Sequence, residues 1–120
     1  MNEIIEEIID SLDDSLLKKE FLLLKNRNKF TGHCYVATEA LYYLLDDNER
    51  KKYCPARLKI NGVTHWFLKN KFNGEIIDIT KEQFNFKLDY KKAKNCFFIT
   101  KNPSKRTKIL ISRIYKKNCY

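Results

Sequence analysis

FTGHCYVATEALYYLL, residues 30–45, places a glycine, a histidine and a cysteine directly before an apolar run with helical spacing. Apolar side chains recur every three or four residues, as at Val36, Ala40 and Leu44, which puts them on one face of a helix. The spacing therefore predicts a helix that begins at Cys34. Unpaired N–H groups and the helix dipole favour negative charge at a helix N-terminus, so a thiolate is stabilised at this position.

Helical spacing also recurs at the two ends of the chain. Residues 1–27 contain two amphipathic segments, in which isoleucines and leucines alternate with charged residues at helical intervals. Residues 103–117 form a basic amphipathic pattern, with Asn102 as the expected N-cap and Pro103 as the expected first helical residue. N-terminal helices and a basic C-terminal helix are therefore predicted.

Between these helices the hydrophobic period changes to that of β-strands. The segments ARLKING, THWFLKN and GEIIDIT are short and rich in β-formers, and hairpin-turn dipeptides separate them, at Asn61-Gly62 and Asn73-Gly74. A three-stranded antiparallel sheet is predicted, in which alternation puts His65 on one face and Trp66 on the other. Helices followed by a sheet and a further helix predict an α+β fold.

Length and composition limit the class of protein. The chain has 120 residues, of which 43% are hydrophobic and 13% aromatic, so we expect one domain over residues 1–120, with an N-terminal helical segment at residues 1–27. No apolar run approaches the roughly 18 residues of a membrane span. The acidic N-terminus also lacks the basic start of a secretory signal, so we expect a cytoplasmic protein without a membrane partner.

The net charge of +9 is unevenly distributed along the chain. The first fourteen residues contain carboxylates and no basic residue, whereas the chain from Tyr90 onward contains basic residues and no carboxylate. Two interpretations are open, because the basic end either binds an anionic partner or packs against the acidic end. Binding to nucleic acid or to an acidic protein would involve the basic residues of the C-terminal helix, Lys105, Arg106, Lys108 and Arg113.

Three side chains provide the parts of an activated thiol, which needs a lowered pKa, a base and a group that orients the base. Cys34 is the candidate nucleophile, and His65, on a strand, is the candidate base. Asp78 lies between apolar residues on the next strand and requires a partner there, because burying an unpaired carboxylate is costly. The N–H of Cys34 and the side-chain amide of Asn28, or less favourably of Asn26, are the candidate oxyanion donors.

Each of these residues also has a purely structural interpretation. Taken alone, Cys34 is a small core residue and His65 a structural histidine, and His33 is a rival base. His33 and Trp66 are also candidate substrate-binding residues. The four cysteines are widely spaced without a C-x-x-C pair, so we expect free thiols, with no metal and no organic cofactor.

The motifs GHCYVATEALYYLL, THWFL and GEIIDITKEQF resemble the YunG-like group of small bacterial and bacteriophage proteins and, more distantly, the papain-like thiol hydrolases of the NlpC type. The resemblance covers about residues 28–115. It implies a compact papain-like core over residues 28–120, which includes the basic C-terminal helix, and in which Cys34 is the nucleophile, His65 the base and Asp78 the orienting group. It places a side-chain oxyanion donor at Asn28, where the family has glutamine.

A function in a bacterium or an infected host cell follows from this resemblance. The expected activity is that of a cysteine-dependent hydrolase or acyltransferase that acts on a peptide, amide or isopeptide bond. Papain-like folds also include inactive relatives. The alternative is therefore a non-catalytic binding protein, such as a phage host-takeover or counter-defence factor.

Overall fold

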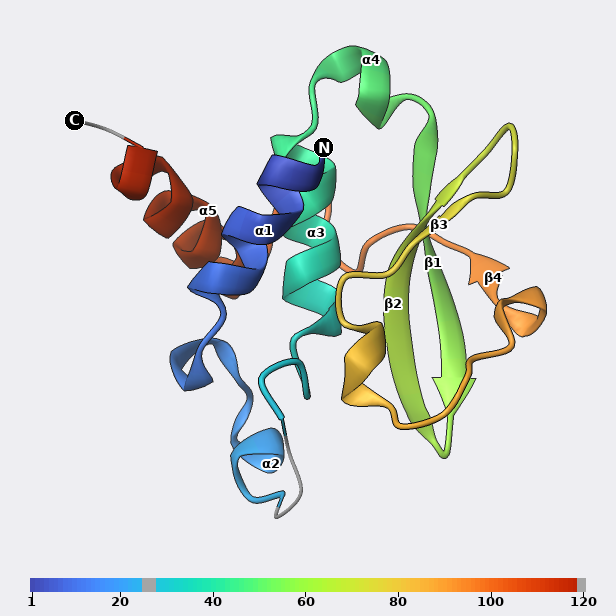
Figure 1. The fold of residues 1–120 in the computed structure, drawn as a ribbon, viewed down its shortest axis with the longest axis horizontal. Coiled ribbons are helices and arrows are strands. Elements are labelled where there is room, and N and C mark those ends of the chain that lie inside the picture. Colours follow the sequence, from blue (N-terminus) through green and yellow to red (C-terminus); the bar gives the residue numbers. More distant parts are fainter. Residues whose placement is uncertain (25–27, 119–120) are drawn as a thin grey trace.

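The computed structural model describes residues 1–24 and 28–118, and it confirms the predicted α+β class. Figure 1 shows the long helices on one side of the molecule and the sheet on the other. The helices are α1 (Asn2–Ser11), α2 (Lys19–Leu22), α3 (Cys34–Leu44), α4 (Asp47–Arg50) and α5 (Lys105–Asn118), with short 3₁₀ turns η1 (Asp14–Leu16), η2 (Lys81–Gln83) and η3 (Tyr90–Lys92). None of the helices described is both long and apolar enough to cross a membrane.

The sheet has four antiparallel strands rather than the predicted three, in the order β3-β2-β1-β4. Its strands are β1 (Tyr53–Ile60), β2 (Val63–Asn70), β3 (Ile76–Ile77) and β4 (Lys94–Asn95). The two-residue strand β4 has no β-forming residue type, which is why the sequence pattern does not reveal it. The Asn61-Gly62 turn is confirmed, since Ile60 pairs with Val63 and both turn residues have positive φ, 51° and 82°.

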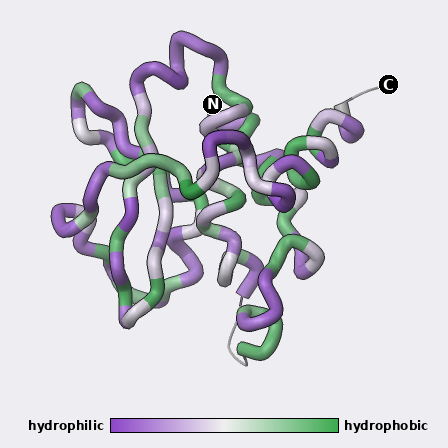
Figure 2. Tube along the Cα trace, turned by 180° about the vertical axis from the view of Figure 1, so that it is seen from behind, coloured by the Kyte–Doolittle hydropathy of each residue, from purple (hydrophilic) through white to green (hydrophobic). Residues whose placement is uncertain are grey.

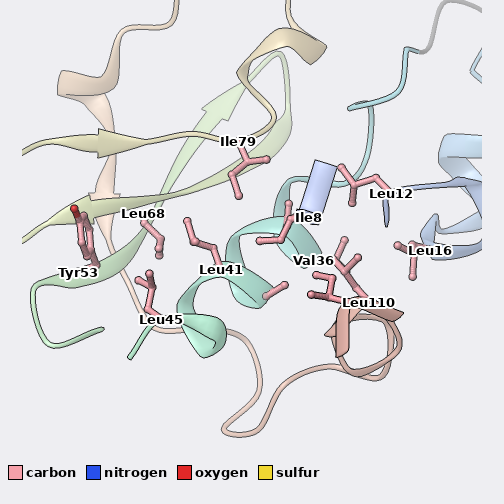
Figure 3. Close-up of a cluster of buried hydrophobic side chains, with 13 residues drawn as sticks. Ile8, Leu12, Leu16, Val36, Leu41, Leu45, Tyr53, Leu68, Ile79 and Leu110 are labelled. Carbon is pink, nitrogen blue, oxygen red and sulfur yellow. The ribbon is translucent and has the colours of Figure 1, made fainter. Parts of the chain in front are cut away.

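Both faces of the sheet are covered by apolar side chains. The larger cluster lies between the sheet and helices α1, α3 and α5, as Figure 3 shows, and includes Ile8, Leu16, Val36, Leu41, Leu68 and Leu110. The smaller cluster lies on the opposite face and consists of Ala56, Leu58, Phe67 and Leu88. Alternation along β2 therefore assigns Leu68 to the helical side and Phe67 to the other side.

The second N-terminal helix is much shorter than its hydrophobic pattern suggests. Leu16 and Leu17 reach the core from the turn η1, and Leu17 is already extended. The chain then leaves the core, so that Leu23 in the following stretch is 83% exposed. Figure 2 shows this apolar stretch in green beside the grey trace. Helical spacing alone does not secure a helix when its apolar face has no surface to pack against.

The C-terminal helix begins at Lys105, and its N-terminal cap is Ser104 rather than the predicted Asn102. The Ser104 hydroxyl accepts a hydrogen bond from the backbone N–H of Thr107 at 3.3 Å. The backbone N–H of Ser104 itself donates to the buried Glu39 carboxylate at 2.9 Å, which joins α5 to α3.

The acidic and basic ends of the chain pack against each other. Helices α1 and α5 are in contact, and Arg113 of α5 forms an ion pair with Asp13 at 3.1 Å. Arg113 also donates to the Ser15 hydroxyl at 2.6 Å. Packing of the basic end against the acidic end, one of the two interpretations of the charge pattern, therefore accounts for the contacts of Arg113.

Candidate active site

Cys34 is the first residue of α3, as predicted, and its side chain is nearly buried. A tight turn at Gly32 brings the chain to this point, with φ +79°. A Cβ at Gly32 would lie 2.7 Å from Cγ of Phe21 and 2.9 Å from Cδ2 of Leu17, so no larger residue fits. The Cys34 thiol faces the Thr64 carbonyl oxygen of β2 at 3.8 Å. The N-terminus of α3 therefore rests against the beginning of the strand that carries His65.

His65 and Asp78 meet across the β2/β3 pair. Leu68 pairs with Ile77 in this ladder, and continuing the register places Asp78 on the same face as His65. His65 Nε2 donates a hydrogen bond to Asp78 Oδ2 at 2.7 Å. The two side chains are 0% and 2% exposed, so this pair is shielded from water.

Tyr90, which carries no signal in the sequence, completes this group. Its hydroxyl donates to the same Asp78 oxygen at 2.8 Å. Burial raises the pKa of the Tyr90 phenol, and the hydrogen bond to Asp78 raises it further, so the phenol remains a donor at neutral pH. Tyr90 lies in the turn η3, and no pattern in the sequence marks a residue there as a partner of a strand carboxylate.

The surroundings of His65 favour its protonated form. Burial, with the Phe84 ring edge-on at 4.9 Å, lowers the pKa of His65, but the hydrogen bond to Asp78 and the neighbouring Cys34 outweigh burial and raise that pKa to about 9. The second ring nitrogen, Nδ1, is buried and has no partner of good hydrogen-bond geometry among the described residues. Because Asp78 holds Nε2, Nδ1 is the nitrogen left for the Cys34 thiol.

A cleft of about 480 Å³ opens beside Cys34, and Trp66 forms part of its wall. Trp66 lies on the face of β2 opposite to His65 and packs edge-on against Tyr35, with ring centroids 4.8 Å apart. It therefore lines the cleft next to the thiol instead of flanking the imidazole. Of the three residues Cys34, His65 and Asp78, Cys34 lines this cleft, whereas His65 and Asp78 are not among its lining residues.

His33 is not placed to act as a base or to bind a substrate. Its ring is buried, and its two nitrogens lie 2.9 Å from the carbonyl oxygens of Lys29 and Asp13. Neither nitrogen is free to accept a proton from a thiol. The reason is the position of His33 as the N-cap residue of α3, where its side chain points back towards the preceding loop and η1.

Asn28, the favoured amide donor, also has other partners. Asn28 Nδ2 donates to the Glu82 carbonyl oxygen at 2.8 Å, and its Oδ1 accepts from the backbone N–H of Phe30 at 2.9 Å. These bonds fix the loop before Cys34, so Asn28 has a positioning part in that loop. Asn26 lies outside the described residues.

The other described cysteines, Cys54 and Cys96, are free thiols, and burial raises the pKa of each. They differ from Cys34 in lying on strand β1 and just after β4, not at a helix start. Cys119 lies outside the described residues. No group of His, Cys, Asp and Glu side chains within the described ranges is arranged to hold a metal ion.

The basic residues predicted for nucleic-acid binding do not share one surface. Lys105 and Lys108 are exposed on α5, but Arg106 lines the Cys34 cleft and Arg113 is bound to Asp13. Comparisons of the chain with protein-family models, with curated proteins and with solved structures returned no match.

Proposed function

We propose that this protein is a cysteine-dependent hydrolase or acyltransferase that acts on an amide or isopeptide bond. Cys34 is the nucleophile, His65 the base and general acid, and Asp78 the group that orients His65. The observation that carries the proposal is the buried His65, bound to Asp78 through Nε2 with Nδ1 left for the thiol. A cysteine at a helix start, followed by a histidine on a strand and an aspartate directly after the next strand, also matches the order of papain-like enzymes.

In the proposed mechanism the reactive form of Cys34 is the thiolate, paired with the imidazolium of His65, whose raised pKa keeps this ring protonated at neutral pH. The Cys34 sulfur attacks the carbonyl carbon of the substrate, an S–C bond forms, and the carbonyl oxygen takes the electron pair. N–H groups at the start of α3, including that of Cys34, have no partner within the helix and are suited to stabilise this oxyanion.

Proton transfer by His65 completes each half of the reaction. The imidazolium gives its proton to the amine nitrogen, the C–N bond breaks, and a thioester remains on Cys34. Water then attacks the thioester while His65 accepts the proton of the water, which releases the acid and restores the thiolate and imidazolium. An amine in place of water would give acyl transfer. Asp78 holds the ring in the orientation that both transfers require.

The test is whether Cys34 accepts and releases an acyl group. Incubation with p-nitrophenyl acetate should acetylate Cys34, detected by intact-mass and peptide-mass spectrometry, and the acetyl group should then be lost on removal of the ester. Cys34→Ser should abolish this transient, whereas Cys54→Ser should leave it intact. Acetylation spread equally over Cys34, Cys54 and Cys96 would contradict the proposal.

The exposed lysines of α5 favour a second candidate function, a binding protein for nucleic acid or for an acidic protein. Lys105, Lys108, Lys116 and Lys117 are all exposed and no carboxylate accompanies them on this helix. Binding of an oligonucleotide through these residues should weaken steeply with added salt and should be reduced in Lys105→Gln/Lys108→Gln. Binding that is insensitive to salt would exclude the nucleic-acid form of this function.

A further inference from the structure

The cleft beside Cys34 has walls of uneven charge. Apolar side chains form much of its lining, and Lys18, Arg57 and Arg106 contribute cations, against one carboxylate, that of Glu20. Arg57 is the cross-strand partner of Trp66 in the β1/β2 ladder, so it lies on the Trp66 face of the sheet. Arg106 comes from the first turn of α5. Three separate parts of the chain therefore supply positive charge around one thiol.

The two arginines of the cleft differ from Arg50 and Arg113, which form intramolecular ion pairs. Among the described residues, Arg50 pairs with Asp47 and Arg113 pairs with Asp13. Arg57 and Arg106 have no carboxylate partner of this kind within the described ranges. An arginine without a carboxylate partner next to a nucleophile is available to a carboxylate of the substrate.

We propose that the cleft selects an acidic polypeptide, in which a carboxylate lies close to the amide or isopeptide carbonyl that Cys34 attacks. This inference rests on the proposed acyl-transfer function and adds the substrate class to it. Arg57 and Arg106 are the specificity-determining residues, and Trp66 is part of the apolar lining of the same cleft.

The form of the cleft favours a polypeptide as the source of the negative charge. A volume of about 480 Å³ holds only a short segment of a substrate. Apolar contact continues outward, because Ile99 and Val63 line the cleft and are 76% and 45% exposed. Apolar side chains that flank an acidic residue would match this combination, whereas a phosphate backbone offers no apolar groups of this kind.

A pair of alkylating reagents tests the charge preference without a known substrate. Iodoacetate and iodoacetamide differ in charge and hardly in size, so the ratio of their rates at Cys34 reports the local potential. We expect this ratio to exceed that of N-acetylcysteine amide by roughly threefold at low salt. Arg57→Gln and Arg106→Gln should each lower the ratio, and Lys59→Gln, a cation on the same strand outside the cleft, should not.

The outcomes separate this inference from the function on which it rests. If Cys34 reacts quickly with both reagents and shows no preference for iodoacetate, the charge selection is wrong and the acyl-transfer proposal survives. If Cys34 reacts no faster than the reference thiol with either reagent, the proposed function fails and the inference falls with it.

Peptide probes test the polypeptide part. Two vinyl sulfone peptides that differ only in a glutamate or a glutamine beside the reactive group should label Cys34 at different rates, with the glutamate peptide faster. Arg57→Gln/Arg106→Gln should lower the labelling rate of the glutamate peptide to that of the glutamine peptide in the same variant, whereas Lys59→Gln should preserve the difference between the two peptides. Equal rates for the two peptides in the unmodified protein would overturn the assignment to an acidic polypeptide.

Discussion

The regions around His33 and His65 contain the same side chain in nearly the same burial, and both lie next to Cys34. His33 adjoins it in sequence, and its ring nitrogens face two main-chain carbonyl oxygens, those of Lys29 and Asp13. His65 is thirty-one positions away, and one of its nitrogens faces the carboxylate of Asp78. His33 connects the loop before α3 to the residue that precedes η1. His65 binds a carboxylate through Nε2, and its Nδ1 has no hydrogen-bond partner among the described residues.

The difference shows that the partners of a histidine, not its distance in sequence from a nucleophile, determine whether it can move a proton. A ring with an acceptor on each side stabilises the fold and has no position left for a thiol. A ring held on one side by a carboxylate has both the orientation and the raised pKa that proton transfer requires.

The sharpest way to break this comparison is to replace each histidine in turn. His65→Gln should reduce the alkylation rate of Cys34 at pH 6 by roughly two to four powers of ten, because the thiolate loses its cationic partner. His33→Gln should change the rate by less than about threefold. Equal losses in the two variants, measured with iodoacetamide and peptide-mass spectrometry, would show that the two regions do not differ in the way described.

A second prediction concerns the stability of the protein against pH. The pKa of His65 is raised from 6.5 to about 9 in the folded state, so protonated His65 stabilises the fold. This stabilisation is complete below about pH 6.5 and is lost as the pH rises through about 9, a fall of about 3 kcal/mol in the free energy of unfolding. Urea titrations at several pH values should show the fall, and His65→Gln should lack it. A fall of the same size in His65→Gln would assign it to other groups.

The region of His33 should matter for stability. His33→Gln replaces two ring nitrogens, each in contact with a main-chain carbonyl oxygen, by a single amide nitrogen, and we expect a loss of about 2 kcal/mol in the free energy of unfolding. Urea denaturation at pH 7 measures it, with Lys59→Gln as a surface control. Unchanged stability would mean that the two main-chain bonds contribute little.

The smallest expected effect concerns Tyr90, and it tests how this residue influences the bond between His65 and Asp78. Tyr90→Phe removes one donor from the Asp78 oxygen that also binds His65. We expect a loss of roughly 1 kcal/mol in stability. The carboxylate should then act more strongly on His65 and raise its pKa further, so the upper limb of the pH profile of Cys34 alkylation should move to higher pH. A shift to lower pH would show that Tyr90 supports the His65–Asp78 bond instead of competing with it.

The parts of this structure that local pattern governs could be predicted from the sequence. The start of α3 at Cys34 and the Asn61-Gly62 hairpin depend on spacing and turn chemistry within a few residues. The juxtaposition of His65 and Asp78 was expected from the alternation of side chains along the strands and from the turn signal at Asn73-Gly74. The strand β4, the cap at Ser104 and the contact of Tyr90 with Asp78 depend on tertiary packing, which leaves no local trace.

Two residues with predicted site roles have other hydrogen-bond partners in the structure. Asn28 and His33 carry suitable groups at suitable positions in the sequence. In the structure, however, Asn28 Nδ2 donates to the Glu82 carbonyl oxygen of η2, and the ring nitrogens of His33 lie against the carbonyl oxygens of Lys29 and Asp13. A sequence shows which donors and acceptors exist, and only the fold shows which of them remain unused. Arg57 and Arg106 illustrate the converse, since their place on the wall of the Cys34 cleft became visible only in the structure.

Strand β3 pairs with β2 through only two residues, Ile76 and Ile77, and it is an edge strand. Asp78 follows it directly, so the position of the carboxylate depends on a short stretch of backbone hydrogen bonds at the border of the sheet. Such stretches open locally at a lower free-energy cost than global unfolding, which hydrogen exchange detects. The bond between Asp78 and His65 therefore has an opening equilibrium of its own, and the protein can lose the alignment of its imidazole while the helices and the central hairpin stay folded.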